Sequence, residues 1–341
     1  MLSQEIVNIV YVLAAVLFIL DLKWMAHPRT AVRGNTAGVL GMSLAIVVTL
    51  LSDKMDWPYL IIGVAVGSLI GAVAATKVKM TSMPEMVGLF NGFGGGASVL
   101  VAGSALVAAM SAMTEQADLQ MRIATVFSAF IGSVTFFGSY VAFGKLAEFL
   151  AVKWKLYTWQ KVIKYTFSLL VAAGFIWYGV SAGIELLSIV LMVSGLAIAG
   201  ILLRKKDRFP GMDVVKVLVA LGAVAFGVWV VLDPANTLLF WTLVGVAGVL
   251  GVLLTLSIGG ADMPVVIALL NSYSGLAAAA TGFVINNTVL IIAGSLVGAS
   301  CLILTNIMCK AMNRSLANVL FATMGPTADT PDADEVYKTV K

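Results

Sequence analysis

Charged side chains are scarce in this sequence. Only 11% of the 341 residues are charged, whereas 60% are hydrophobic, and the mean hydropathy is +1.02. A soluble domain has about 25% charged residues, and a water-soluble fold has too little core to bury this much apolar surface. We therefore predict an all-α integral membrane protein, a polytopic helix bundle that has lipid as its solvent.

Cysteine and histidine are scarce too. The only two cysteines, Cys301 and Cys309, lie in one apolar run, which argues against a disulfide framework and a cysteine-based metal site. We expect both to be packing residues. The only histidine, His27, lies beyond the first apolar run, so we expect it in a surface loop rather than in a proton relay within the membrane.

Long apolar runs make up most of the chain. A helix needs about 20 apolar residues to cross a bilayer, and these runs lack the alternation of barrel strands. No Lys or Arg precedes the first run, which therefore reads as a retained helix rather than a signal peptide. Division at charges, prolines and polar clusters predicts eleven membrane helices, at about residues 5–22, 36–52, 59–76, 86–110, 123–144, 165–183, 186–203, 214–232, 238–258, 265–285 and 289–308.

Lysine and arginine are distributed unevenly between the two sides that eleven helices define. Seventeen follow odd-numbered helices, and only Lys54 and Arg122 lie in the loops on the other side. Because cytoplasmic loops are enriched in Lys and Arg, the N-terminus is predicted outside and the C-terminus in the cytoplasm. The net charge of +4 is then a property of these loops and predicts no nucleic-acid partner.

One segment occurs twice. MPEMVGLFNGFGGGA begins at Met83 and MPVVIALLNSYSGLA begins at Met263, 180 residues later. Asn91 and Asn271 each lie seven residues after the proline of their copy, roughly 10 Å along a helix. Both helices are predicted to enter from the cytoplasm, so the repeat is parallel and the two amides are expected at similar depth within the hydrocarbon.

A primary amide in lipid needs hydrogen-bond partners. Two interpretations stay open from the repeat alone: the amides join helices, or they line a polar path for protons or ions. The small residues beyond each amide predict close helix packing and room for water. GFGGGA also matches a dinucleotide fingerprint, but that fingerprint requires a preceding strand and a soluble βαβ unit, so we reject it.

Four charged residues are predicted at the cytoplasmic mouth of these helices. Their simplest interpretation is a favourable helix dipole for the acidic pair and membrane anchoring for the basic pair. Alternatively, together they could bind or gate a cytoplasmic domain. The four are Glu85, Asp262, Lys310 and Arg314.

Four segments of the sequence together resemble a known protein family. MTSMPEMVGLFNGFGGGA, IGSVTFFGSYVAFGKL, IGGADMPVVIALLNSYSG and LVGASCLILTNIMCKAMNRS together resemble the membrane domain of the beta subunit of proton-translocating NAD(P) transhydrogenase. The resemblance covers about residues 1–146 and 207–322.

The resemblance implies a function and its partners. Residues 1–322 would form a proton-translocating domain in a bacterial inner membrane, and this chain would bind no cofactor. NAD(H) would bind to an alpha subunit and NADP(H) to a Rossmann-like domain, in a complex that is a dimer as a whole. The polar, acidic segment 323–341 would lead towards that NADP-binding domain, although from its composition it equally fits a frayed terminus.

The resemblance also implies site residues. Asp262, Lys310 and Arg314 match positions linked to the face that meets the NADP-binding domain, and Glu85 is placed with them at the cytoplasmic gate. No catalytic residue and no metal site are expected. The expected proton path contains Asn91, Asn271, Ser272, Tyr273 and Ser300.

Three departures from the family pattern stand out. Many members carry a histidine where this chain has Asn91, and an amide cannot titrate near neutral pH, whereas histidine can. The titrating group is therefore expected on another chain, or water carries the proton. Residues 147–206 look like a two-helix insertion, and the sequence given stops where the NADP-binding domain would begin.

Two other functions remain as alternatives. Internal repeats are also common in secondary transporters, and a self-contained proton-coupled transporter is the runner-up, although few charges occur within the predicted spans. A membrane scaffold without transport is the third possibility, and it would tolerate apolar residues at Asn91 and Asn271.

Overall fold

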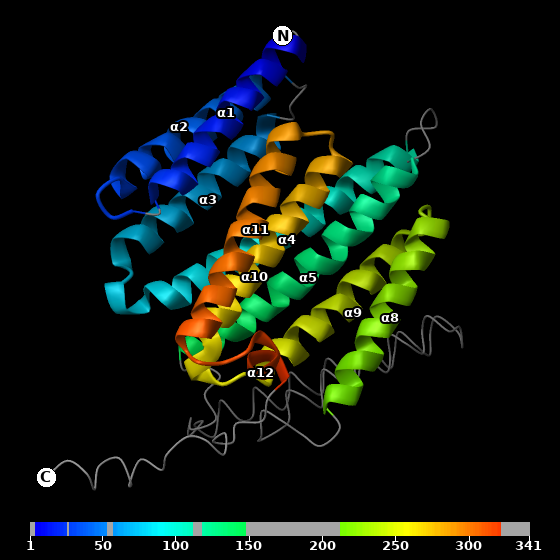
Figure 1. The fold of residues 1–341 in the computed structure, drawn as a ribbon. Helices are drawn as coiled ribbons and strands as arrows, with labels where there is room; N and C mark the ends of the chain where they lie inside the picture. Colours follow the sequence, from blue (N-terminus) through cyan, green and yellow to red (C-terminus); the bar gives the residue numbers. More distant parts are fainter. Residues whose placement is uncertain (1–3, 26, 53–56, 112–117, 148–211, 322–341) are drawn as a thin grey trace, which may run out of the picture.

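The computed structural model describes residues 4–25, 27–52, 57–111, 118–147 and 212–321, and within these ranges the chain is helical without a strand (Figure 1). The same ranges contain nine helices long and apolar enough to cross a membrane. They are α1 (Gln4–Met25), α2 (Ala31–Ser52), α3 (Trp57–Lys77), α4 (Met83–Ser111), α5 (Leu119–Leu146), α8 (Met212–Leu232), α9 (Thr237–Leu256), α10 (Met263–Val284) and α11 (Thr288–Ala311). Three short helices complete this part of the chain: η1 (Met80–Ser82), η2 (Gly260–Asp262) and α12 (Leu316–Phe321).

These helices confirm the all-α polytopic fold and nine of the predicted spans, with ends that differ by a few residues. The predicted spans 165–183 and 186–203, almost all of the expected insertion 147–206 and the tail 323–341 lie outside the described residues. The total of eleven helices and the orientation of the termini therefore stay predictions. Below, the inner end of the bundle is the predicted cytoplasmic one, where α4 and α10 begin.

The centre of the bundle is built from α4, α5, α9 and α10, with α5 packed against the other three. In Figure 1, α8 flanks α9 on one side, while on the other side α1 lies beside α11 and α2 packs against α1. Among the described helices, α5, α9 and α10 bury the largest shares of their lengths, and α3 buries none of its residues. The central helices thus provide a protein interior, whereas α3 faces its surroundings on all sides.

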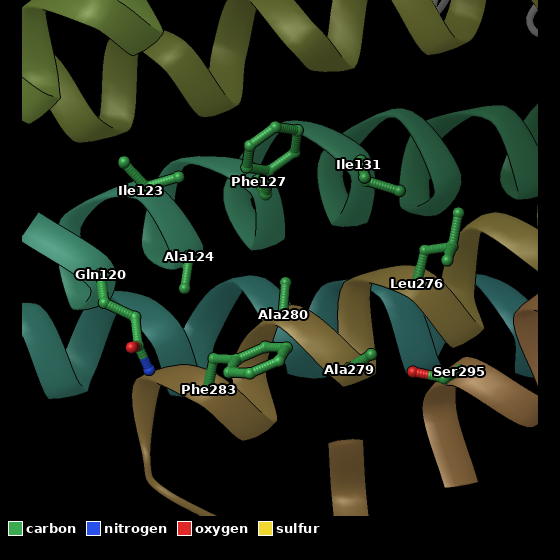
Figure 2. Close-up of a pocket in the computed structure, with 10 residues that line it drawn as sticks. All are labelled: Gln120, Ile123, Ala124, Phe127, Ile131, Leu276, Ala279, Ala280, Phe283 and Ser295. Atoms are coloured by element: carbon green, nitrogen blue, oxygen red, sulfur yellow. The ribbon is translucent and has the colours of Figure 1, made fainter. Parts of the chain in front are cut away.

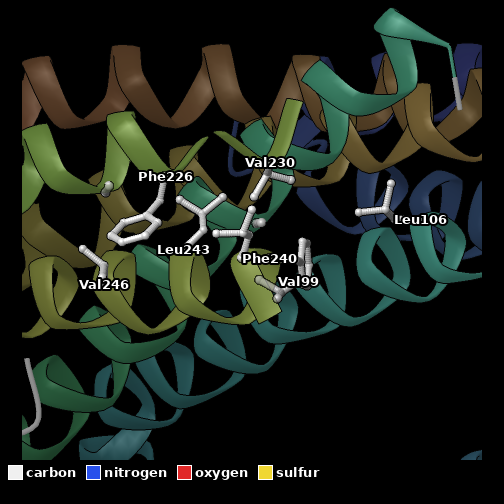
Figure 3. Close-up of a cluster of buried hydrophobic side chains, with 10 residues drawn as sticks. Val99, Leu106, Phe226, Val230, Phe240, Leu243 and Val246 are labelled. Carbon is white, nitrogen blue, oxygen red and sulfur yellow. The ribbon is translucent and has the colours of Figure 1, made fainter. Parts of the chain in front are cut away.

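One apolar cluster joins α4, α5, α8 and α9. Its labelled side chains in Figure 3 are Val99, Leu106, Phe226, Val230, Phe240, Leu243 and Val246. Lipid tails are as apolar as these side chains, so tight packing rather than escape from water stabilises such contacts. The buried residues of α5 are accordingly Gly, Ala, Ser, Thr and Val, which let neighbouring backbones approach.

Polar residues set the helix ends. Asp118 and Asn287 begin α5 and α11 by accepting hydrogen bonds from Met121 N and Leu290 N, which pairs amide groups that a helix start leaves unsatisfied. Asn286, with φ of 53°, ends α10 in the left-handed conformation that asparagine tolerates. The pair Asn286–Asn287 therefore makes the tight turn that sends α11 back alongside α10.

Candidate functional site

The duplicated sequence is also a duplicated structure. A single 3-10 turn, η1 or η2, precedes each copy, and the two turns are 180 residues apart, as the sequence motifs are. In both copies the chain then enters a long helix at the Met-Pro pair, where the missing N–H of proline costs nothing. The sequence repeat therefore corresponds to one structural unit, a 3-10 turn followed by a membrane helix.

Asn91 lies at a junction of three helices. Its Nδ2 donates to Ser139 Oγ on α5 at 2.9 Å, and its Oδ1 accepts from Ser274 Oγ on α10 at 2.6 Å. The residue is only 8% exposed, so both ends of the amide are satisfied inside the bundle. Asn91 thus connects α4 to α5 and to α10 at the same point.

Asn271 has a different environment. Its Nδ2 donates to Cys301 Sγ on α11 at 3.0 Å, and the residue is half-buried. Cys301 is therefore more than the packing residue that we expected, because it accepts a hydrogen bond from the second amide. Cys309 does match that expectation, since it is buried in an apolar cluster with Met263 and Ile267.

The two amides are not level with each other. Side chains of α10 bond to residues of α4 that lie 183 positions earlier, at Ser274–Asn91 and again at Thr281–Ser98. Two such contacts in the same order confirm that α4 and α10 run parallel. Asn271 lies three residues before Ser274, which places it about 4.5 Å nearer the inner end. The two amides, which were expected at similar depth, are therefore offset by nearly one helical turn.

Glycines bring the helices of each copy into backbone contact. A Cβ on Gly95 would lie 2.7 Å from the backbone oxygen of Gly132 on α5, and one on Gly275 would lie 2.5 Å from the backbone nitrogen of Gly298 on α11. Gly95 and Gly275 occupy equivalent places in the repeat. Their contacts confirm the close packing predicted from the small residues.

The other residues of the expected path are less closely connected. Ser272 is 1% exposed and donates to the backbone oxygen of Gly298 at 2.5 Å, a bond that joins α10 to α11. Tyr273 packs at the edge of the apolar cluster around Met263, and Ser300 is half-buried on α11. The structure thus ties Ser272 to the α10–α11 contact but not to the Asn91 junction.

At the inner end, Asp262 and Arg314 form an ion pair. Asn313 ends α11 in a left-handed conformation. The backbone N–H of Asn313 donates to Lys310 O, and that of Arg314 donates to Cys309 O. This Schellman turn brings Arg314 back over the start of α10. Asp262 is 5% exposed, and its Oδ1 is buried without a hydrogen-bond partner in the described structure.

The remaining charged candidates lie apart from that pair. Lys310 is exposed in the last turn of α11, and Glu85 is half-buried in the first turn of α4. Both are favourably placed for the dipoles of their helices. His27 is exposed beyond α1, as expected of a surface position.

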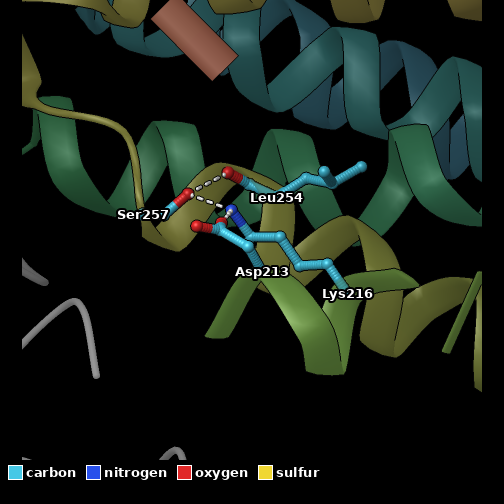
Figure 4. A network of polar contacts seen from close by, with 4 residues as sticks. All are labelled: Asp213, Lys216, Leu254 and Ser257. Carbon is cyan, nitrogen blue, oxygen red and sulfur yellow. Dashed lines mark hydrogen bonds and ion pairs between the residues drawn. The ribbon is translucent and has the colours of Figure 1, made fainter. Parts of the chain in front are cut away.

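Sequence reasoning missed two lysines next to the start of α10. Lys145 of α5 donates to Leu256 O at 2.6 Å and to Ile258 O at 2.8 Å. Lys216 of α8 is 3% exposed and donates to Ser257 Oγ at 2.8 Å while it pairs with Asp213 (Figure 4). Positive charge at a helix C-terminus is favourable, so both lysines hold the end of α9 immediately before η2.

Ser139 and Ser274 were missed as well, although a signal for each was present. Ser139 falls on a stripe of small residues with three- and four-residue spacing along α5, which also holds Thr125, Ser128, Gly132 and Thr135. Such a stripe marks one helix face. Ser274 follows Asn271 by three residues and so lies on nearly the same face of α10.

A hollow of about 670 Å³ lies between α5, α10 and α11 (Figure 2). Its lining is mainly apolar, with Phe127, Leu276 and Phe283 prominent and Gln120 and Ser295 as its polar side chains. None of the residues of the Asn91 junction lines it. The hollow is therefore a feature separate from the polar site.

Comparison with known proteins identifies the family to which the chain belongs. The family model of the NAD(P) transhydrogenase beta subunit matches residues 7–205 and 192–341. The NAD(P) transhydrogenase subunit beta of Rhodospirillum rubrum is 35% identical over 332 residues, which cover 95% of this chain and 59% of the relative, and the protein of its strain ATCC 11170 gives the same values. The chain thus spans about three fifths of the length of these relatives. The chain is an integral, multi-pass membrane protein, and it belongs to the NAD(P) transhydrogenase beta subunit family.

Proposed function

We propose that this chain is the proton-conducting membrane part of a proton-translocating NAD(P) transhydrogenase in a bacterial inner membrane. The observation that carries the proposal is the Asn91 junction, where one buried amide bonds to hydroxyls on two other helices. Polar groups at this depth in a membrane helix are costly unless they have a function or a partner. Family membership supports this reading over a self-contained transporter.

The amide has a defined part in such a path. Its Nδ2–H groups can only donate and its Oδ1 only accepts, so Asn91 fixes the orientation of Ser139 Oγ and Ser274 Oγ. It does not itself take up the proton near neutral pH. The proton therefore moves over water and hydroxyl groups beside the amide, or to a titratable group that another chain supplies.

We further propose that the Asp262–Arg314 pair transmits the proton state to a cytoplasmic domain. Asp262 immediately precedes α10, the helix that carries Asn271 and Ser274, and Arg314 is partly exposed at the inner end. A domain that docks there and draws Arg314 away would leave a buried carboxylate unpaired. Glu85 and Lys310 belong to the same proposed docking face.

The nucleotide chemistry is proposed to take place on partners. An alpha subunit would bind NAD(H), a separate NADP-binding domain would bind NADP(H), and the whole complex would be a dimer. The 341 residues themselves would bind neither nucleotide, with 1–322 as the proton domain and 323–341 as the linker. Calorimetry of the purified chain with NADPH tests this, and tight binding would contradict it.

A substitution in the assembled complex tests the proton path. Asn271→Leu replaces the second amide by an apolar side chain with the same branching, and we expect hydride transfer coupled to proton movement to fall while assembly persists. Asn306→Leu, at an exposed position on α11, is the matched control and should leave the rate unchanged. Full coupled activity in Asn271→Leu would remove this amide from the path.

A further inference from the structure

A second buried polar cluster lies outward of the Asn91 junction, between the same three helices. Ser128 Oγ of α5 and Thr281 Oγ1 of α10 are 2.7 Å apart, and Ser98 O of α4 accepts from both hydroxyls, at 3.1 and 3.4 Å. Ser128 is 0% and Thr281 2% exposed. Ser98 follows Asn91 by seven residues, which places this cluster about 10 Å closer to the outer end along α4.

The hydrogen bonds of this cluster can reverse direction. Each hydroxyl has one proton and two acceptor lone pairs. Ser128 can donate to Thr281 or to Ser98 O, and Thr281 can donate to Ser128, to Ser98 O or to its own helix at Ala277 O, 2.9 Å away. A chain of hydroxyls relays a proton only if every member can accept one proton and then release another. This cluster meets that condition.

A free hydroxyl extends the cluster outward. Thr125 precedes Ser128 by three residues on the same small-residue stripe of α5, so it lies one turn nearer the outer end. Its side chain is 0% exposed, and its Oγ1 has no hydrogen-bond partner within the described part of the chain. A buried hydroxyl without a partner costs about 1–3 kcal/mol, and bound water satisfies such groups in protein interiors.

The two clusters are separated by backbone. Gly95 lies between Asn91 and Ser98 on α4, Gly132 lies between Ser128 and Ser139 on α5, and a Cβ on either glycine would approach the backbone oxygen of the other to 2.7 Å. Ala277, 0% exposed, lies between the clusters on α10. Thr135, the stripe residue between Ser128 and Ser139 on α5, donates to its own helix at Ile131 O, 2.8 Å away. No hydrogen bond among the described residues therefore joins the two clusters across the Gly95–Gly132 contact.

We propose that Thr125, Ser128 and Thr281 form an outward proton-relay site that binds water and receives protons from the outer side, with the Gly95–Gly132 contact as the barrier to Asn91. This inference rests on the proposed function as a proton conductor. It adds a site at which protons from the outer side bind before they cross the barrier. Each hydroxyl passes on one proton as it takes up another, so no residue changes its net charge.

The test uses the complete transhydrogenase complex reconstituted in vesicles. The double substitution Ser128→Ala/Thr281→Val removes both hydroxyls with little change of volume, and we expect proton translocation to fall at least about tenfold. Thr125→Val alone should lower it severalfold, because the water loses one partner. Ser128→Thr keeps the hydroxyl and should retain most of the rate, as should Thr242→Val, a control on a buried threonine that bonds only its own helix at Leu238 O.

The outcomes separate this inference from the function on which it rests. If the unmodified complex moves no protons, the proposed function fails. If the unmodified complex moves protons and Asn91→Leu stops it, but the double variant and Thr125→Val translocate at the full rate, the outer relay site is wrong. Because Thr125→Val removes a hydroxyl that has no partner among the described residues, its effect on proton movement, with folding unchanged, would not be produced by a purely structural role.

Discussion

The α4–α5 pair and the α10–α11 pair are two versions of one unit, and their polar contacts differ. In both, a 3-10 turn leads into a helix with an asparagine, and a glycine four residues later touches the backbone of the next helix. In the first pair, Asn91 is buried and bonds to serines on two helices. In the second pair, Asn271 is half-buried and bonds to a thiol on one helix.

At the inner end of the bundle, the second copy is the more buried of the two. Met83, which opens the first copy, is 47% exposed, whereas its counterpart Met263 is fully buried next to the paired Asp262. The position equivalent to Asp262 in the first copy is Ser82. The polar contacts of the first copy therefore centre on the middle of the bundle, whereas the second copy also has a charged contact at its inner end.

The largest effect on stability is expected at the glycine contacts that both copies share. Gly95→Val and Gly275→Val each force a side chain into the backbone of the next helix, and overpacking without room to relax costs about 1–3 kcal/mol or more. We expect both variants to lose most of the folded protein in detergent, as measured by thermal unfolding. Gly94→Val, where a Cβ meets no atom within 4 Å, is the matched control; equal losses in all three would refute the backbone contacts.

The next effect separates the two amides. Asn91→Leu removes the side-chain partner of the buried Ser139 and of the half-buried Ser274, whereas Asn271→Leu removes only the partner of a half-buried thiol. Loss of a buried hydrogen-bond partner costs about 1–3 kcal/mol, so we expect Asn91→Leu to reduce proton translocation about ten- to hundredfold and Asn271→Leu by less. A larger effect of Asn271→Leu would reverse the assignment of the two copies.

A smaller effect is expected at the inner end. Arg314→Ala leaves the buried Asp262 without its charged partner, and because Arg314 is 39% exposed we expect a loss of stability of about 1–2 kcal/mol rather than the larger cost of a fully buried pair. Glu85→Ala removes a first-turn carboxylate and should cost less than about 1 kcal/mol. Unfolding midpoints in detergent give the order, and equal shifts would show that the two inner ends are equivalent.

The smallest effect comes from making the second copy resemble the first. Cys301→Ser gives Asn271 a hydroxyl acceptor like that of Ser139, and coupled activity should stay within about twofold because the bond is kept. Cys301→Ala removes the acceptor and should lower activity more. If Cys301→Ala matches the unmodified complex while Cys301→Ser does not, the apolar character of the side chain rather than its hydrogen bond decides at this position.

The membrane helices of the described part could be predicted from the sequence because their signal is local. An apolar run of about 20 residues is sufficient to recognise a span, and nine runs became helices with ends within a few residues. The Asn91 and Asn271 pair was also recognisable, because the chain repeats the motif around it. Both features depend on residues close together in the sequence.

The contacts between helices could not be predicted in the same way. Ser274 rather than Asn271 meets Asn91, because α10 is shifted by three residues against α4 when both pack on α5. That shift depends on how the helices fit together, which no local pattern encodes. The Asp262–Arg314 pair depends in the same way on Asn313, whose left-handed turn brings together residues 52 positions apart.

The three-helix junction at Asn91 is the central claim, and one measurement addresses it most directly. Ser139→Ala/Ser274→Ala leaves the amide in place but removes both of its partners, and proton translocation by the reconstituted complex is measured against Ser104→Ala, an exposed serine on α4 that bonds its own helix. We predict a fall of at least about tenfold in the double variant and none in the control. An unchanged rate in the double variant would show that protons do not pass this junction.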